Sequence, residues 1–139
     1  SYRFKKRNIQ FDIVIDPDFP LLNLEYRNWN LAIICLLKSA EEALFEKNGG
    51  NIRLAAQIDG DNLMISLQDD GPSFPAELIA NPALLTEQSG MSDGRLKANL
   101  GFVYRYVQSL GGSVQLANQE DSVEFALFVP LANLLTPNG

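Results

Sequence analysis

The sequence predicts an α+β fold, a two-layer sandwich in which a mixed, mostly antiparallel sheet is covered on one face by helices. Along the 139-residue chain, the spacing of apolar residues changes from every second residue, typical of strands, to helical spacing and back. Two segments have the pattern of β-hairpins, and a helical segment precedes each of them. The order strand, helix, hairpin, long loop, helix, hairpin is typical of helices packed on one side of a sheet.

The first strand and the first helix occupy the N-terminal third of the chain. Residues 9–16, IQFDIVID, alternate apolar and polar side chains, which predicts a half-buried strand that ends at Pro17. Residues 28–47 have helical spacing, and the Asn-Gly-Gly at 48–50 ends the helix. The apolar face that we predict for this helix holds Leu31, Ile34, Leu37 and Leu44, and is widened by Trp29, Ile33, Leu36 and Ala40.

The remaining elements are two hairpins and a second long helix. Residues 52–68 read as strand, turn and strand around the sequence DGDN. Residues 77–99 predict a long, partly helical loop, a feature more typical of lids and binding loops than of plain connections. Residues 100–110 are apolar at helical spacing, and residues 113–131 form a second hairpin that ends at Pro130. The two helices should pack on one face, with Ile34, Leu37, Val103, Val107, Phe125 and Leu127 buried.

Length and apolar content predict a single domain. We expect a basic linker end at residues 1–8, the domain itself at 9–131 and a loose tail at 132–139. The formal net charge of −6 argues against nucleic acid and against membrane contact by this domain. No run is long enough for a transmembrane helix, and no signal peptide is visible, so we expect a cytoplasmic location.

The absence of histidine restricts the chemistry. A chain without histidine has no Ser-His-Asp triad, no Cys-His pair and no histidine-containing zinc site. The single cysteine, Cys35, excludes an internal disulfide and lies in an apolar helical run, so we expect it to be buried for packing. Any catalysis must use carboxylates, backbone amides, a cofactor or a partner's residue.

Four motifs occur in an order that resembles the ATP-binding domain of sensor histidine kinases. They are CLLKSAEEA at residues 35–43, DDGPSFP at 69–75, KANL at 97–100 and a final helix end and hairpin at 110–131. This is the Bergerat fold of the GHKL superfamily, and the resemblance covers residues 9–131. Each motif is weak alone, and it is their order and spacing that is specific.

The helix motif resembles the family pattern N-L-L-x-N-A-x-E-A. The second Asn of the family coordinates the magnesium that bridges the ATP phosphates, and Ser39 stands there, with Cys35 at the first Asn. Both lie on one side of the helix. A hydroxyl is a weak magnesium ligand and a thiol a poor one. The Glu that activates water in gyrase-type ATPases is absent at Cys35, so we assign no catalytic residue.

The opening stretch resembles the family pattern D-N-G-P-G-I-P, which follows a strand. The resemblance implies that Asp69 accepts a hydrogen bond from the adenine amino group. Gly71 stands at the first glycine of the family pattern. Ser73 replaces the second glycine, where the backbone passes close to the nucleotide and a Cβ crowds it. A simple strand-end turn remains the alternative, because Asp, Gly, Pro and Ser are ordinary turn residues.

The phosphate motif of the family, G-x-G-L, is altered. Counting back from Gly111-Gly112 places Leu100 at the family Leu, so Lys97 and Asn99 stand at the two glycines. A shifted register would instead use Gly101 as one glycine and shorten the apolar helix face. In either register the double-glycine loop that binds phosphates through backbone amides is broken. Lys97 offers charge in compensation, although an exposed lysine beside a loop is more often simply solvated.

The resemblance predicts a degenerate domain of two-component signalling. We expect ATP and magnesium binding to be weak or lost, with the fold retained for docking or regulation. The implied partners are a helical dimerisation and phosphoacceptor domain and a response regulator. The alternative is an active histidine kinase domain, an ATP-dependent phosphotransferase that passes the γ-phosphate to a histidine in a separate domain, so enzymatic activity is left open.

Overall fold

A computed structural model describes residues 8–16, 26–45, 47–87 and 94–134, with the backbone alone for residues 26 and 94–98. It contains one five-stranded sheet with the order β1-β2-β3-β5-β4. β1 pairs with β2 in parallel, and every other pair is antiparallel. The strands are β1 (Ile9–Ile15), β2 (Gly50–Asp59), β3 (Asn62–Asp69), β4 (Ser113–Asn118) and β5 (Val123–Pro130).

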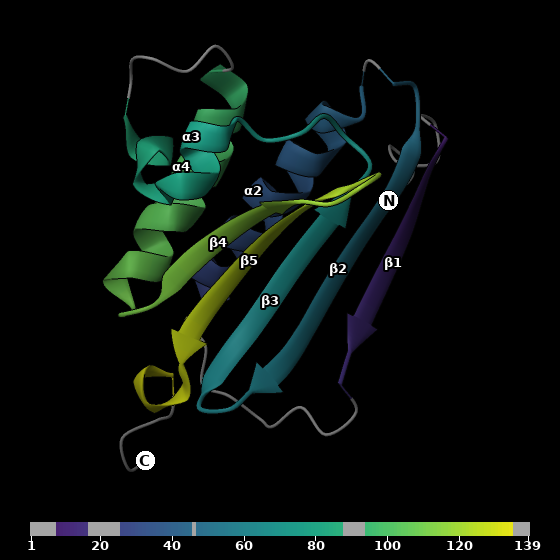
Figure 1. Cartoon of the computed structure of the whole chain (residues 1–139). Helices are drawn as coiled ribbons and strands as arrows, with labels where there is room; N and C mark the ends of the chain where they lie inside the picture. The colour runs from purple at the N-terminus through teal and green to yellow at the C-terminus, as the bar shows by residue number, and fades with distance from the viewer. Residues whose placement is uncertain (1–7, 17–25, 46, 88–93, 135–139) are drawn as a thin grey trace.

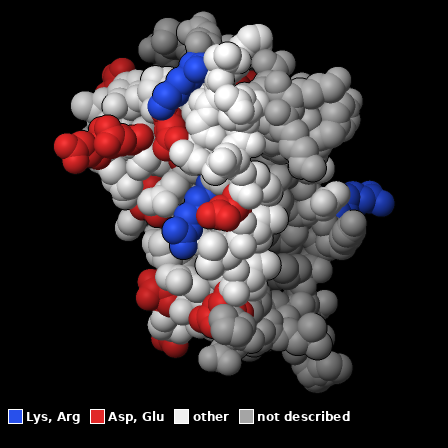
Figure 2. All heavy atoms as spheres, turned by 90° about the vertical axis from the view of Figure 1, so that its right-hand side faces the viewer, with Lys and Arg blue, Asp and Glu red and all other residues white. Residues whose placement is uncertain are grey.

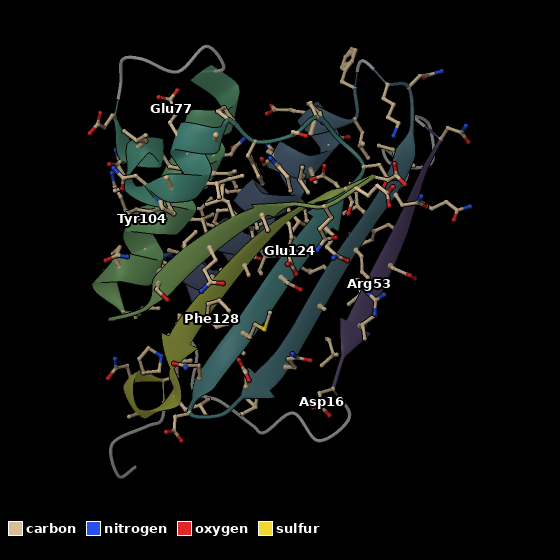
Figure 3. The ribbon with its side chains drawn as sticks, in the orientation of Figure 1. Asp16, Arg53, Glu77, Tyr104, Glu124 and Phe128 are labelled. Carbon is tan, nitrogen blue, oxygen red and sulfur yellow. The ribbon has the colours of Figure 1, made fainter. Side chains whose placement is uncertain are left out.

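Two long helices cover one face of this sheet, as the sequence predicts. α2 (Tyr26–Ala43) and α4 (Gly94–Ser109) lie on the same side, and the short α3 (Ala76–Ala80) lies beside α4 (Figure 1). Alternate residues of the strands point toward the helices and are buried, including Leu67, Phe125 and Leu127. The other face of the sheet is open and carries polar side chains such as Arg53 and Glu124, which are labelled in Figure 3.

The buried face of α2 is rotated from the predicted one. Ile34 is 40% exposed, so its predicted burial was wrong, and Leu37 is only half-buried. Leu31, which we placed on the same apolar face, is 43% exposed. The core face consists of Trp29, Ala32, Leu36, Ala40 and Leu44. Apolar residues nearly encircle this helix, so periodicity alone does not fix which side packs against the sheet. The predictions for Val103 and Val107 on α4 are confirmed.

Strand β1 is less buried than its alternating pattern predicts. Ile9 is buried, but Ile13 and Ile15 are 57% and 58% exposed. β1 is an edge strand, at the side of the sheet farthest from α4 in Figure 1. Acidic and a few basic side chains are scattered over this side of the molecule, shown in Figure 2, without a continuous basic patch among the described residues.

The predicted loop at 77–99 is largely helical, so this expectation was wrong in part. α3 is followed directly by a 3₁₀ helix, η1 (Pro82–Thr86), and α4 begins at Gly94 rather than at residue 100. Leu78 and Leu85 are buried and fix the segment to the body. Pro82 is the first residue of η1, a position where proline is favourable, so Asn81-Pro82 separates two helices. Residues 88–93 lie outside the described part.

The C-terminal strand continues into a packed turn. η2 (Leu131–Asn133) follows β5, the Asn133 side chain donates to the Leu110 carbonyl at 2.8 Å, and Leu134 is buried. The packed structure therefore extends to Leu134, beyond the predicted start of the loose tail, and residues 1–7 and 135–139 lie outside the described residues. None of the described helices is long and apolar enough to cross a membrane.

Candidate functional site

The structure brings the three predicted site segments together at the C-terminal turn of α2. A Cβ on Gly71, in the loop after β3, would lie 2.7 Å from the Ala43 Cβ. On the neighbouring residue of α2, the Glu42 Oε1 accepts a hydrogen bond from Asn99 Nδ2 of α4 at 3.2 Å. Ser39 lies one helical turn earlier and is buried.

Asp69 is the last residue of β3 and points toward the helices, where it is 7% exposed. Its Oδ1 accepts a hydrogen bond from the Gly71 N–H at 2.8 Å, which fixes the carboxylate. Burial raises the pKa of Asp69 from 3.8 to about 6, the Gly71 N–H opposes this rise, and the neighbouring Asp70 adds to it. Such a group is a candidate for ligand recognition rather than for stability.

Gly71 occupies a position that a side chain cannot share. A Cβ added at Gly71 would lie 2.7 Å from both the Asp69 Oδ1 and the Ala43 Cβ, and 3.3 Å from the Ala43 carbonyl oxygen. The glycine therefore lets the loop pass against the end of α2. Ser73 is exposed on the same loop.

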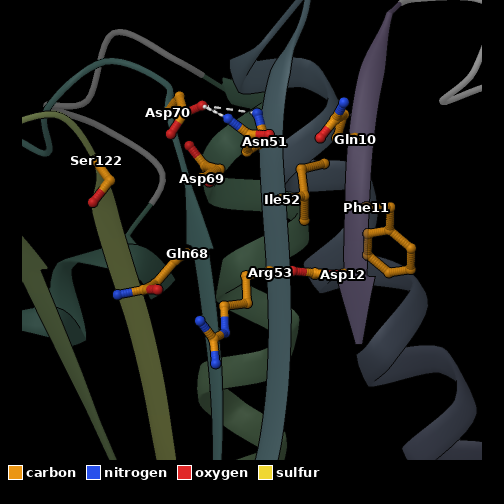
Figure 4. A pocket seen from close by; sticks show the side chains of 10 residues that line it. All are labelled: Gln10, Phe11, Asp12, Asn51, Ile52, Arg53, Gln68, Asp69, Asp70 and Ser122. Atoms are coloured by element: carbon orange, nitrogen blue, oxygen red, sulfur yellow. Dashed lines mark hydrogen bonds between the residues drawn. The ribbon is translucent and has the colours of Figure 1, made fainter. Parts of the chain in front are cut away.

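Two amide side chains hold this loop from either side, and sequence reasoning missed both. Asp70 Oδ2 accepts hydrogen bonds from the Asn51 backbone N–H at 2.8 Å and from Asn51 Nδ2 at 2.9 Å (Figure 4). Asn118 accepts from the Phe74 N–H at 2.8 Å and donates to the Phe74 carbonyl at 3.0 Å. Lys47 Nζ also donates to the Asp70 carbonyl at 3.0 Å. The loop conformation is thus set by the protein itself.

The predicted metal position does not fit magnesium. Ser39 supplies a buried hydroxyl, and Cys35 is a half-buried thiol whose pKa is raised by burial, although Lys38 lowers it. Magnesium requires hard oxygen ligands, and a neutral hydroxyl beside a protonated thiol is a poor set. Among the described residues, no three His, Cys, Asp or Glu side chains gather as a metal site.

The start of α4 does not present a free amide at Asn99, one of the two predicted phosphate positions. In an α-helix only the first four N–H groups lack an intrahelical partner, and α4 begins at Gly94. The amides of Asn99 and Leu100 therefore lie inside the helix. Lys97 belongs to α4, but its side chain lies outside the described residues. Gly101 packs against the Leu85 carbonyl, where a Cβ would be 2.7 Å from the oxygen, which favours the register that places Asn99 at a family glycine.

A cavity of about 320 Å³ opens at the same end of the sheet, but mainly on its open face (Figure 4). Asp12, Arg53 and Gln68 form one cross-strand row of its wall. Its full lining is Gln10, Phe11, Asp12, Asn51, Ile52, Arg53, Gln68, Asp69, Asp70 and Ser122. Of the predicted site residues that the structure describes, only Asp69 lines this cavity; Asp70 lines it too and belongs to the same DDGPSFP stretch.

Comparisons with known proteins agree with this fold. Over 122 residues, 86% of the chain, it is 30% identical to a protein of Rickettsia conorii named putative sensor histidine kinase NtrY-like. Its structure matches the nucleotide-free catalytic domain of histidine kinase ThkA with a TM-score of 0.78 and 20% identity, over 94% of this chain and 84% of that one. This chain is a histidine kinase-type domain with the Bergerat fold.

The histidine kinase-type domain also matches larger assemblies. It matches full-length ShkA in complex with AMPPNP, with a TM-score of 0.75, 22% identity and coverage of 98% of this chain and 28% of ShkA. It matches ThkA in complex with the response regulator TrrA, with a TM-score of 0.74 and 20% identity, over 95% of this chain and 37% of that one. The chain spans 18% of the length of the Rickettsia conorii relative. No family model matches the sequence.

Proposed function

We propose that this chain is the catalytic-type domain of a sensor histidine kinase-like protein in two-component signalling, with a degenerate nucleotide site. ATP and magnesium bind weakly or not at all, and the domain acts by docking and regulation. The observation that carries the proposal is the hydrogen bond from Asn99 to Glu42, because it joins α4 to α2 at a position where the family has a phosphate-binding glycine.

The adenine side of the site supports the resemblance to nucleotide-binding relatives. Asp69 is buried and oriented by the Gly71 N–H, so a carboxylate oxygen is available to accept from an adenine amino group. Gly71 lies against Ala43, where a side chain would collide. These two residues retain the part of the site that recognises the base.

The phosphate and metal side is altered at every position that the resemblance marks. Ser39 and Cys35 replace the two Asn of the helix motif, Ser73 replaces a loop glycine, and Lys97 and Asn99 replace the glycines before α4. Without glycine at 97 and 99, α4 extends back to Gly94 and uses its own amides. The backbone donors that would hold phosphates are therefore engaged in the helix.

Docking partners follow from the same resemblance. The chain contains no histidine, so a phosphoacceptor must lie in another domain or chain. The solved complex of ThkA with the response regulator TrrA supports partners of this kind. We propose a helical dimerisation and phosphoacceptor domain and a response regulator as the partners.

An active kinase domain is the second candidate, and the intact Asp69 favours it. Phosphoryl transfer depends on positioning and charge stabilisation. A phosphate site with some residues replaced therefore retains part of the phosphoryl-transfer rate if Lys97 and Ser39 contact the phosphates. The relative named NtrY-like is a putative sensor histidine kinase, which agrees with this candidate.

Calorimetric titration with ATP in the presence of magnesium separates the two candidates. Degeneracy predicts no binding tighter than the high-micromolar range, about −5 to −6 kcal/mol. Low-micromolar binding that requires magnesium would contradict it and favour the active kinase. If the site is degenerate, a parallel incubation of the chain with ATP and a histidine-containing phosphoacceptor domain should show no transfer of phosphate.

A further inference from the structure

We propose that the outer edge of β1 is an interaction surface and that its partner is a second copy of this chain, bound by antiparallel pairing of the two β1 strands. β1 is the edge strand at the side of the sheet farthest from α4 (Figure 1). Three features of β1 point to this association: its exposed apolar side chains, its outward backbone groups and the spacing of its acidic residues. The association goes beyond the proposed function and does not depend on nucleotide binding.

β1 ends in three consecutive apolar residues that are exposed. Ile13 and Ile15 point to the same, helical face of the sheet as Ile9, yet they are 57% and 58% exposed while Ile9 is 6% exposed. Val14 points to the open face and is 40% exposed. A single exposed apolar residue is ordinary, but a run of them on an edge strand is typical of a surface that another chain covers.

The backbone of β1 offers hydrogen-bonding groups at its outer edge. The Asp16 N–H, directly after β1, donates to the Ala56 carbonyl of β2 at 3.1 Å. Because the N–H groups of successive strand residues point to opposite sides, those of Asp12 and Val14 also point toward β2, and that of Ile13 points outward. Among the described residues, β1 pairs with no strand other than β2. A partner strand therefore finds a donor and an acceptor at Ile13 that β2 does not use.

Antiparallel pairing about Ile13 makes the strand complementary to itself. The Ile13 residues of the two copies lie opposite each other and exchange both backbone hydrogen bonds, because their N–H and C=O groups point outward. On the helical face, Ile15 then lies opposite Phe11 of the second copy, so an apolar row crosses the twofold axis. On the open face, Asp12 lies opposite Val14 of the second copy. Each copy uses the same surface, so the contact closes as a dimer.

The acidic side chains of β1 disfavour the neighbouring registers. Pairing about Asp12 would place the two Asp12 carboxylates opposite each other, and pairing about Val14 would place Asp12 opposite Asp16 of the second copy. Like charges directly opposite each other on a sheet destabilise the pair. Pairing about Phe11 would leave Ile15 outside the apolar row. Of these registers, the one about Ile13 alone joins the apolar residues without opposing two carboxylates.

The contact is short, so the dimer is weak. β1 has 7 residues, and one strand pair of this length buries less than the roughly 1,200 Å² of an ordinary stable interface. We expect a dissociation constant of about 10–500 μM. Such a contact forms mainly where two copies are held close together, because a high local concentration then replaces affinity.

Analytical ultracentrifugation of the wild-type chain, from about 5 μM to about 1 mM, should show a reversible equilibrium between monomer and dimer. Ile13→Lys and Ile13→Glu each place two like charges opposite each other at the twofold axis, so each variant alone should stay monomeric. An equimolar mixture of the two should dimerise again, because lysine then lies opposite glutamate. Leu31→Lys is the matched control, since Leu31 is an exposed apolar residue of α2, and it should dimerise like the wild type. Thermal unfolding verifies that each variant folds.

Amide hydrogen exchange locates the contact within β1. The Ile13 N–H points outward, so it should exchange at least about threefold more slowly at about 1 mM than at about 5 μM. The Val14 N–H points toward β2 and should exchange at the same rate at both concentrations. Equal exchange of Ile13 at the two concentrations would show that β1 is not the contact.

The remaining outcomes also decide the matter. A wild-type chain that is monomeric up to about 1 mM overturns the inference. So does a dimer that Leu31→Lys weakens as much as Ile13→Lys, or a mixture of the two Ile13 variants that stays monomeric, because either result places the contact elsewhere. None of these results concerns ATP binding, so the inference can fail while the proposed function stands.

Discussion

At the residue scale, Asp69 combines a cost to folding with a position suited to ligand recognition. Asp69 pairs with Ile52 of β2 and lies two residues after the buried Leu67, so its side chain points to the same, helical face of the sheet. There it is buried and its pKa is raised to about 6. A protein keeps such a group at a cost when the group serves binding.

Replacing Asp69 with Asn should stabilise the fold in a pH-dependent way. Because folding raises the pKa of Asp69 from 3.8 to about 6, its contribution favours the native state most at low pH and is lost as pH rises through about 6. Asp69→Asn keeps an oxygen for the Gly71 N–H and removes the buried charge. We expect a gain in unfolding free energy of about 1–3 kcal/mol near pH 8 and almost none near pH 4.

Urea denaturation at these two pH values measures the effect, with Glu87→Gln as an exposed control that should change little at either pH. A loss of stability at high pH in Asp69→Asn would show that the carboxylate is held by favourable contacts rather than desolvated. The same variant should lose any adenine binding.

Gly71 is the second residue whose role follows from a short contact. Gly71→Ala adds a Cβ that would stand 2.7 Å from Asp69 Oδ1 and from Ala43 Cβ, so the loop or the end of α2 must shift. We expect a loss of about 1–3 kcal/mol of stability. Ser73→Ala, on the exposed part of the same loop, is the control and should be nearly neutral. Equal thermal unfolding of the two variants would contradict the close packing of Gly71.

At the element scale, local patterns predicted the type of each strand and long helix but not how they meet. Alternation and turn signals were sufficient for both hairpins, whose turns lie at 60–61 and 119–122. The rotation of α2 and the early start of α4 were not predictable in this way. Leu31 and Ile34 are as apolar as Leu36, and the choice between them depends on which side meets α4 and the sheet.

The clamp between Asn118 and Phe74 is a contact of elements that the sequence did not reveal, because 44 positions separate the two residues. Asn118→Ala removes both hydrogen bonds and should free the loop after β3. We expect faster amide hydrogen exchange at Phe74, by about tenfold or more, with a loss of global stability of only about 1 kcal/mol. Exchange at Val123, in β5, should stay slow. Unchanged exchange at Phe74 would show that the loop is held without Asn118.

At the scale of the whole molecule, the fold was predictable from the sequence to a greater degree than the site. The scaffold matches histidine kinase catalytic domains over nearly the whole chain. The motif order predicted it because packing tolerates substitution as long as the apolar pattern is kept. At the candidate site, the sequence singled out Asp69 and Gly71 by residue type, and their role in nucleotide binding stays a prediction. Glu42, Asn51 and Asn118 were not singled out, because ordinary polar residues acquire their roles only through long-range contacts.

The central claim is that a complete kinase-type scaffold has lost its phosphate and metal side through a few substitutions, and its most direct test is to reverse them. The variant combines Ser39→Asn, Ser73→Gly and Asn99→Gly, and calorimetry compares its ATP affinity with that of the wild type, with and without magnesium. We expect wild-type binding that is high-micromolar or absent, and a magnesium-dependent gain of at least about tenfold in the variant. Low-micromolar, magnesium-dependent ATP binding by the wild type, equal to that of the folded variant, would contradict the claim.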